Sequence, residues 1–212
     1  MDFILSSTFI SHSIWYIIIE FRYKYFISSS NVMLENLLNN DDTDVDYYTN
    51  ILSYTLMGGI LTSLLFGLLY NLCINYYSSR PSLLQRMLMP TVLPQCVTTL
   101  LCVLLSLLVL LENRSLLYAS FVVLLLLRSS VNTMGTCFLT SLYPPNVFGP
   151  MYGLLSLEAG VTGLLIYAFY QWMEHSAVQV NVFWLVSSLL TLGHPLSMWW
   201  KSHRGERLKT TT

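Results

Sequence analysis

The sequence predicts an all-α, polytopic membrane protein, and two observations carry this prediction. Hydrophobic residues make up 54% of the 212 residues and charged residues only 10%, whereas a soluble domain carries about 25% charged residues. The apolar residues also gather in windows of about 20, the length of an α-helix that crosses a ~30 Å hydrocarbon core. Water would not solvate such a surface, so we expect the lipid bilayer to surround the chain.

Six apolar windows follow one another along residues 1–200, which we interpret as one six-helix transmembrane domain. Residues 201–212 then form a short basic cytoplasmic tail. An even number of spans places both termini on the same side of the membrane. The expected spans cover residues 4–29, 51–74, 91–111, 116–143, 148–173 and 180–200.

The charges of the links predict the orientation. The link after the first span contains four aspartates and no cation, and the link after the second contains Arg80 and Arg86 and no acid. Because cytoplasmic links are enriched in Lys and Arg, we expect both termini and the Arg80/Arg86 link in the cytoplasm. The plasma membrane is the expected location, although the helix spans themselves do not indicate a target membrane. Asn113 of "NRS" then lies outside as a candidate glycosylation site, although such a tripeptide also occurs by chance.

Several function classes are not expected. The formal net charge is −1, and no Lys/Arg block occurs outside the tail, so we expect no nucleic-acid partner. The four cysteines and four histidines lack metal-ligand spacing. There is no visible set of nucleophile, base and orienting group, and no phosphate-binding loop. We therefore expect neither an enzyme nor a bound metal or cofactor.

Five ionisable residues fall inside the expected spans: Glu20, Arg22, Lys24, Arg128 and Glu158. Such groups cost about 2.5 to 3.5 kcal/mol each at membrane depth, so they usually face a cavity or a partner. Glu20 and Lys24 are four residues apart and can pair on one helix face, while Arg22 points the other way. Glu158 is a candidate partner for Arg22 or Arg128.

The fourth span has a polar side. Arg128, Asn132 and Gly135 share one face at 100° per residue. Because lipid does not solvate such a stripe, it must meet water or other helices. A water-filled path is the favoured interpretation, and hydrogen bonding between helices is the alternative. The adjoining sector contains Ser129, Thr133, Thr136 and Thr140.

The segment "SLYPPNVFGPMYGLLSLEAG" joins the fourth and fifth spans. Pro144 and Pro145 predict a tight link, and Pro150 suits the first turn of the next helix. Glu158 lies opposite a line of small residues, which predicts close packing against a neighbouring helix. That line consists of Gly149, Gly153, Ser156, Gly160 and Gly163.

This junction resembles the one between the tenth and eleventh helices of solute carrier family 43 transporters, in the major facilitator superfamily. The family pattern is an Arg before a Pro, followed by F-G and G-L, and it is matched by Arg128, Pro144, Phe148, Gly149, Gly153 and Leu154. "YYTN" before the second span and "VNVFW" with His194 and Pro195 in the last also match. The resemblance runs from about residue 10 to residue 200.

The resemblance implies half of an alternating-access carrier that moves a small neutral organic solute by facilitated diffusion. The solute would bind between two such halves, with Arg22, Arg128, Asn132 and Glu158 lining or bracing the cavity. The motifs "YTN", "CFLT", "VNV" and His-Pro favour the branch similar to equilibrative purine nucleobase transporters. The sister branch, which carries large neutral amino acids, is the alternative.

Two departures from the family pattern matter. Where the family has an Asp in its cytoplasmic gating link, this chain has Asn71, four residues after Gly67. Family members have twelve helices, whereas six are expected here, corresponding to the C-terminal half. The resemblance therefore implies a missing N-terminal half or a second copy as partner; a non-transporting six-helix protein and a truncated half-transporter are the alternatives.

Overall fold

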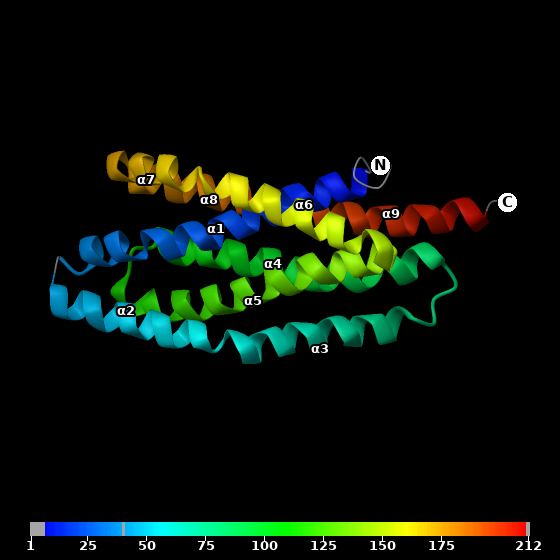
Figure 1. Cartoon of the computed structure of the whole chain (residues 1–212), viewed down its shortest axis with the longest axis horizontal. Helices are drawn as coiled ribbons and strands as arrows, with labels where there is room; N and C mark the ends of the chain where they lie inside the picture. Colours follow the sequence, from blue (N-terminus) through cyan, green and yellow to red (C-terminus); the bar gives the residue numbers. More distant parts are fainter. Residues whose placement is uncertain (1–6, 40, 211–212) are drawn as a thin grey trace.

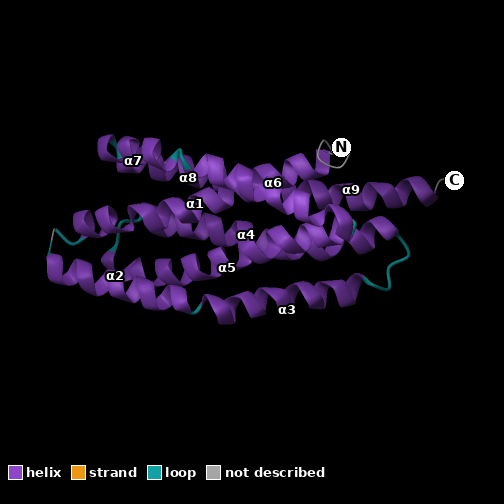
Figure 2. Ribbon diagram, in the orientation of Figure 1, coloured by secondary structure: helices purple, strands orange, loops and turns teal. Residues whose placement is uncertain are grey.

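The computed structural model describes residues 7–39 and 41–210, with side chains to residue 203. Within these residues the chain is helical and contains no strand, which confirms the all-α prediction (Figures 1 and 2). The elements are α1 (Ser7–Leu37), α2 (Asp42–Met57), α3 (Gly59–Tyr77), α4 (Leu83–Leu110), the 3-10 turn η1 (Arg114–Leu116), α5 (Leu117–Leu142), α6 (Pro145–Gly163), α7 (Ile166–His175), α8 (Ala177–Leu190) and α9 (Gly193–Thr210).

Five helical stretches are long and apolar enough to cross a membrane: residues 59–77, 83–110, 114–142, 145–175 and 177–203. They suit a multi-pass integral membrane protein. The α1 helix has 31 residues, about 46 Å at 1.5 Å per residue, so it is also long enough. Its charges at Glu20, Arg22, Lys24 and Glu35 set it apart from the other five, so a sixth span stays a prediction.

Three of the expected spans are each interrupted. Residues 51–74 fall on α2 and α3, which meet at Gly58. The fifth expected span is divided between α6 and α7 at Leu164 and Leu165, and the last between α8 and α9 at Thr191 and Leu192. Each break leaves the two segments roughly in line (Figure 1).

The α4 helix begins at Leu83, eight residues before the expected boundary of 91, because Pro90 and Pro94 lie inside the helix without ending it. Prolines are tolerated in membrane helices where neighbours satisfy the freed backbone groups. Pro145 occupies the first turn of α6 after the tight link at Tyr143 and Pro144. The expectation that Pro150 lies in that first turn was therefore wrong.

The links divide between the two ends of the bundle. The α1 helix begins and α9 ends where α3 connects to α4, on the right of Figure 1. The α1–α2, α4–α5 and α7–α8 links lie at the opposite end. This arrangement is the one expected from an even number of passes. The expected tail continues α9 as far as Thr210; residues 211–212, and residues 4–6 of the first expected span, lie outside the described residues.

The acidic segment after α1 caps and begins a helix. Asp41 is the N-cap of α2, and its carboxylate accepts hydrogen bonds from the backbone nitrogens of Thr43 at 3.1 Å and Asp44 at 3.4 Å. Negative side chains in a first turn also suit the positive end of the helix dipole. Asp44 then pairs with Arg114 at 2.5 Å, which joins α2 to the link before α5.

The core is built around α1, which is buried on several sides along its middle. Its N-terminal half packs with α4, α5 and α9. The His12 ring stacks on Phe138, and Trp15 Nε1 donates to Thr99 Oγ1 at 2.9 Å. His194 Nδ1 lies 2.8 Å from the Ser11 hydroxyl, which joins α9 to α1.

Candidate functional site

The four predicted cavity residues do not form one site. Arg128 and Asn132 are exposed on α5, Arg22 is buried on α1, and Glu158 on α6 is half-buried. Two ion pairs are found in the described residues, Glu20 with Lys24 and Asp44 with Arg114. Neither Arg22 nor Arg128 therefore has a carboxylate within 4.0 Å there. The pairing expected between Glu158 and one of these arginines is therefore not seen. The Glu158 carboxylate keeps one buried oxygen without a hydrogen bond.

Arg128 and Asn132 belong to a polar face shared by α1 and α5. Tyr23 of α1 faces Asn132, and its hydroxyl lies within electrostatic range of Arg128 and Glu20. We call these residues, with Lys24, the exposed polar face, after the exposed side chains of Arg128 and Asn132; Tyr23 and Glu20 are buried behind them and Lys24 is half-buried. It combines an aromatic ring, an amide and both signs of charge in helices that are otherwise apolar.

Glu20 is paired with a cation of its own helix. Lys24 Nζ lies 2.7 Å from its carboxylate, which confirms the expected pair. Tyr16, one turn earlier on α1, lies within electrostatic range of Glu20. Tyr16 lies where α1 meets Gly135, and a Cβ at that glycine would be only 2.6 Å from the Tyr16 ring. Gly135 is thus explained by close packing rather than by a water-filled path.

Part of the Ser/Thr sector of α5 contacts α3, and part of it is exposed. The Ser129 and Thr62 hydroxyls are 2.6 Å apart, and Tyr70 of α3 donates to the backbone oxygen of Cys137 at 3.3 Å and contacts Ser141. These contacts hold α5 against α3, as the helix-packing alternative predicts. The interpretation of the whole stripe as water-facing was therefore wrong for this edge. Thr140 remains exposed.

Arg22 lies in a different environment from Arg128. Its side chain is 1% exposed, its Nε donates to Ser106 Oγ at 3.1 Å, and the guanidinium lies 6.0 Å from the centre of the Trp184 ring. Ser106 in turn contacts Ser188 at 3.3 Å. These partners belong to α4 and α8, so Arg22 faces away from the exposed polar face.

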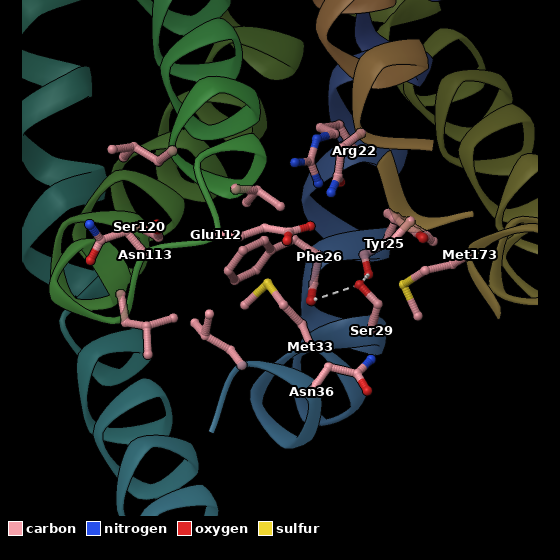
Figure 3. Close-up of a pocket in the computed structure, with 16 residues that line it drawn as sticks. Arg22, Tyr25, Phe26, Ser29, Met33, Asn36, Glu112, Asn113, Ser120 and Met173 are labelled. Atoms are coloured by element: carbon pink, nitrogen blue, oxygen red, sulfur yellow. Dashed lines mark hydrogen bonds between the residues drawn. The ribbon is translucent and has the colours of Figure 1, made fainter. Parts of the chain in front are cut away.

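A cavity of about 170 Å³ lies beside Arg22 (Figure 3). Three parts of the chain enclose it: the C-terminal half of α1, the α4–α5 link with its flanking helix ends, and the junction of α7 with α8. The α1 residues that line the cavity run from Arg22 to Leu37, which is about 22 Å along the helix axis at 1.5 Å per residue. We call this space the Arg22 cavity.

The line of small residues on α6 does not pack against a helix of this chain. A Cβ added at Gly149, Gly153, Gly160 or Gly163 would meet no atom of the described residues within 4 Å, and Ser156 is exposed. The expectation of close packing was therefore wrong within this chain. The opposite side of α6, with Met151, Leu155 and Ala159, is the one buried in the core.

Asn113 lies at the tip of the α4–α5 link with its side chain exposed. It is the N-cap of η1, and its Oδ1 accepts from the backbone nitrogen of Ser115 at 2.8 Å. Glycosylation there stays a prediction. Over the described part of the chain, no group of three His, Cys, Asp or Glu side chains is placed to hold a metal ion.

Sequence reasoning missed Tyr16, Tyr23 and the Arg22 cavity. The two tyrosines are seven residues apart and lie on the same side of α1 as Glu20, so the periodicity that found the Glu20–Lys24 pair would also have found them. The cavity has no such signal, because residues 22–37, 108–120 and 173–181 line it together.

The sequence of the chain is similar to that of a membrane transporter. It is 26% identical over 199 residues to equilibrative nucleobase transporter 1 of Bos taurus. The match covers 90% of this chain but 41% of that protein, so the chain spans less than half the length of the relative. No protein-family profile and no solved structure matches it. Similarity over most of the chain, with helices that suit a multi-pass membrane protein, supports kinship with a family of membrane transporters.

Proposed function

We propose that this chain is one half of a facilitative transporter for a small neutral organic solute, with purine nucleobases as the favoured class. The observation that carries the proposal is the match to an equilibrative nucleobase transporter along 90% of the chain. A match of that extent involves the helices throughout and does not depend on one motif.

The exposed polar face supports a solute-binding role. Polar and charged groups on membrane helices usually face a cavity or a partner, because lipid does not solvate them. Asn132 offers amide donors and an acceptor, and Tyr23 offers a ring and a hydroxyl. A purine base is planar and carries donors and acceptors on its edges, so these groups suit its chemistry. Arg128 adds a donor fork beside them.

The other side of the solute path would come from a second six-helix unit. The chain covers 41% of its relative, and carrier sites commonly lie at the interface between two repeats near the bilayer midplane. In this arrangement the exposed polar face and the open glycine line of α6 face the partner. The partner is a missing N-terminal half or a second copy of this chain.

Uptake of radiolabelled adenine and leucine, measured side by side, tests the proposal. Cells express this chain alone or together with the part of the bovine relative that lies outside the match, and surface abundance is measured in each case. Adenine uptake that unlabelled guanine competes, in either condition, supports nucleobase transport. Leucine uptake instead moves the proposal to large neutral amino acids.

The two expression conditions separate the remaining alternatives. Uptake only on co-expression identifies a half-transporter that needs the missing half, whereas uptake by the chain alone indicates that copies of it suffice. Absence of uptake in both conditions, from abundant and correctly inserted protein, contradicts the transport proposal. A non-transporting membrane protein is then the better description.

A further inference from the structure

We propose that the Arg22 cavity binds a small monovalent carboxylate, at a site separate from the exposed polar face. The carboxylate accepts hydrogen bonds from Arg22 and Tyr25, and its short alkyl chain lies against the apolar wall. The proposal does not rest on the transport function, because binding here needs neither a second half nor movement of solute.

Unpaired donors beside the cavity are the first argument. A guanidinium has five N–H donors, yet Arg22 has one hydrogen-bond partner among the described residues, and its buried Nη2 has none. Tyr25, three residues further along α1 and 2% exposed, has a hydroxyl without a partner. Both groups can donate, so the missing partner is an acceptor.

Charge is the second argument. Arg22 is 1% exposed and has no carboxylate within 4.0 Å in the described part of the chain. An isolated buried cation is unfavourable unless it is paired and hydrogen-bonded. The Ser106 hydroxyl and the Trp184 ring supply only dipolar and cation–π contacts. A bound carboxylate supplies the missing charge and matches the fork of guanidinium N–H groups.

The size and lining of the cavity define the ligand further. Its volume of about 170 Å³ is below the ~300 to 1,000 Å³ of sites for drug-sized molecules, so only a small molecule fits. The rest of the wall is mixed. Apolar side chains form one part, which suits a short alkyl chain: Phe26, Met33, Leu37, Leu108, Val109, Leu117, Met173 and Ala177. Uncharged polar side chains form another: Ser29, Asn36, Asn113, Ser120 and Asn181.

Glu112 restricts the charge of the ligand. It lies in the α4–α5 link, is exposed, and lines the cavity across from Arg22 in Figure 3. A second negative charge on the ligand would be repelled by this carboxylate at the mouth of a site that holds one cation. A monovalent anion is therefore preferred over a divalent one.

The test is direct binding of radiolabelled butyrate to the purified chain in nanodiscs of phosphatidylcholine, with butyramide as the neutral analogue of the same shape. Unlabelled butyrate should displace the label at least ten times more effectively than butyramide. Arg22→Gln should weaken binding at least tenfold, and Glu112→Gln should strengthen it about two- to fivefold through loss of repulsion. Arg86→Gln, an exposed arginine in the first turn of α4, is the matched control and should leave binding unchanged.

Three outcomes would overturn the proposal. Equal competition by butyrate and butyramide shows that the anionic group is not recognised. Unchanged binding in Arg22→Gln removes the assigned residue. Stronger displacement by chloride than by butyrate assigns the site to a halide. Glu112 is exposed, so Glu112→Gln should fold. If Arg22→Gln does not fold, the butyrate affinity of Glu112→Gln still tests the proposal, and unchanged affinity would contradict it.

Discussion

Arg22 on α1 and Arg128 on α5 are both arginines within apolar helices, yet the bundle gives them opposite surroundings. Arg22 is enclosed by α4 and α8, with Ser106 and Trp184 as neighbours. Arg128 is exposed, beside Tyr23 and Asn132. Two residues that look equivalent in the sequence therefore belong to different sites.

The difference follows from the side of the helix on which each arginine lies. α1 has 14 buried residues and α5 has 13; on α1, Arg22 points towards α4 and α8, whereas Lys24 is half-buried on another side. α5 is buried against α3 and α4 on one side and open on the other. On such a helix the face decides whether a polar group binds its neighbours or remains free for a solute.

The largest effect is expected where α1 and α5 touch. Gly135→Leu places side-chain atoms in the space of the Tyr16 ring, which already lies 2.6 Å from an added Cβ. Overpacking of this kind costs about 3 kcal/mol and lowers the unfolding temperature by about 6 to 12 °C. Thermal unfolding in detergent measures it. Gly160→Leu, made at an exposed glycine with open space, is the control; equal losses in both variants would contradict the close-packing explanation.

Arg128→Gln tests the solute role of the exposed polar face. If transport proceeds as proposed, we expect adenine uptake to fall about tenfold or more, equivalent to about 1.4 kcal/mol. The unfolding temperature should stay within about 1 °C because Arg128 is exposed. Arg86→Gln serves as the matched arginine control. Normal uptake by well-expressed Arg128→Gln protein removes Arg128 from the site.

Arg22→Met tests whether the buried arginine destabilises the protein when no anion is bound. Without a bound anion, removal of an unpaired buried cation should raise stability by about 1 kcal/mol, because an apolar side chain of similar length has no desolvation penalty. Ser106 keeps Ser188 as a partner. Thermal unfolding in butyrate-free detergent provides the measurement. A fall of several degrees would instead mean that Arg22 has a strong partner in the protein itself.

Asp44→Asn is expected to have the smallest effect. The Asp44–Arg114 pair is partly exposed to solvent, and such pairs are worth about 1 kcal/mol or less. The loss of stability should be smaller at high salt than at low salt, because salt screens the attraction between the two charges. Comparison of unfolding temperatures at the two salt concentrations decides this. A loss that does not depend on salt would show that Asp44 acts mainly as part of the helix start.

Features set by local spacing were predicted well from the sequence. The helices follow from the apolar windows, the Glu20–Lys24 pair from its four-residue spacing, and the tight link from Pro144 and Pro145. The break at Gly58 had a signal in the Gly58–Gly59 pair that was not used. The break at Leu164 and Leu165 follows Gly163, the last residue of α6, so it too had a glycine signal that was not used.

Features that depend on tertiary neighbours were not predicted. The small residues of α6 indicate that a close approach is allowed, but a helical wheel does not say whether the neighbour belongs to the same chain. Arg22 was grouped with Arg128 because both are charged and within expected spans. Only the packing of α1 against α4 and α8 separates the two arginines.

The burial of the helices is uneven across the bundle, and this affects handling of the protein. The apolar windows of α3 and of α6–α7 are only 11% buried, against 56% for α5, and these two segments lie along opposite edges in Figure 1. Detergent must therefore cover both edges when the chain is extracted, while the centre is shielded by the protein itself. Mild long-chain detergents or nanodiscs, which keep a continuous apolar belt, suit purification better than short-chain detergents that exchange rapidly.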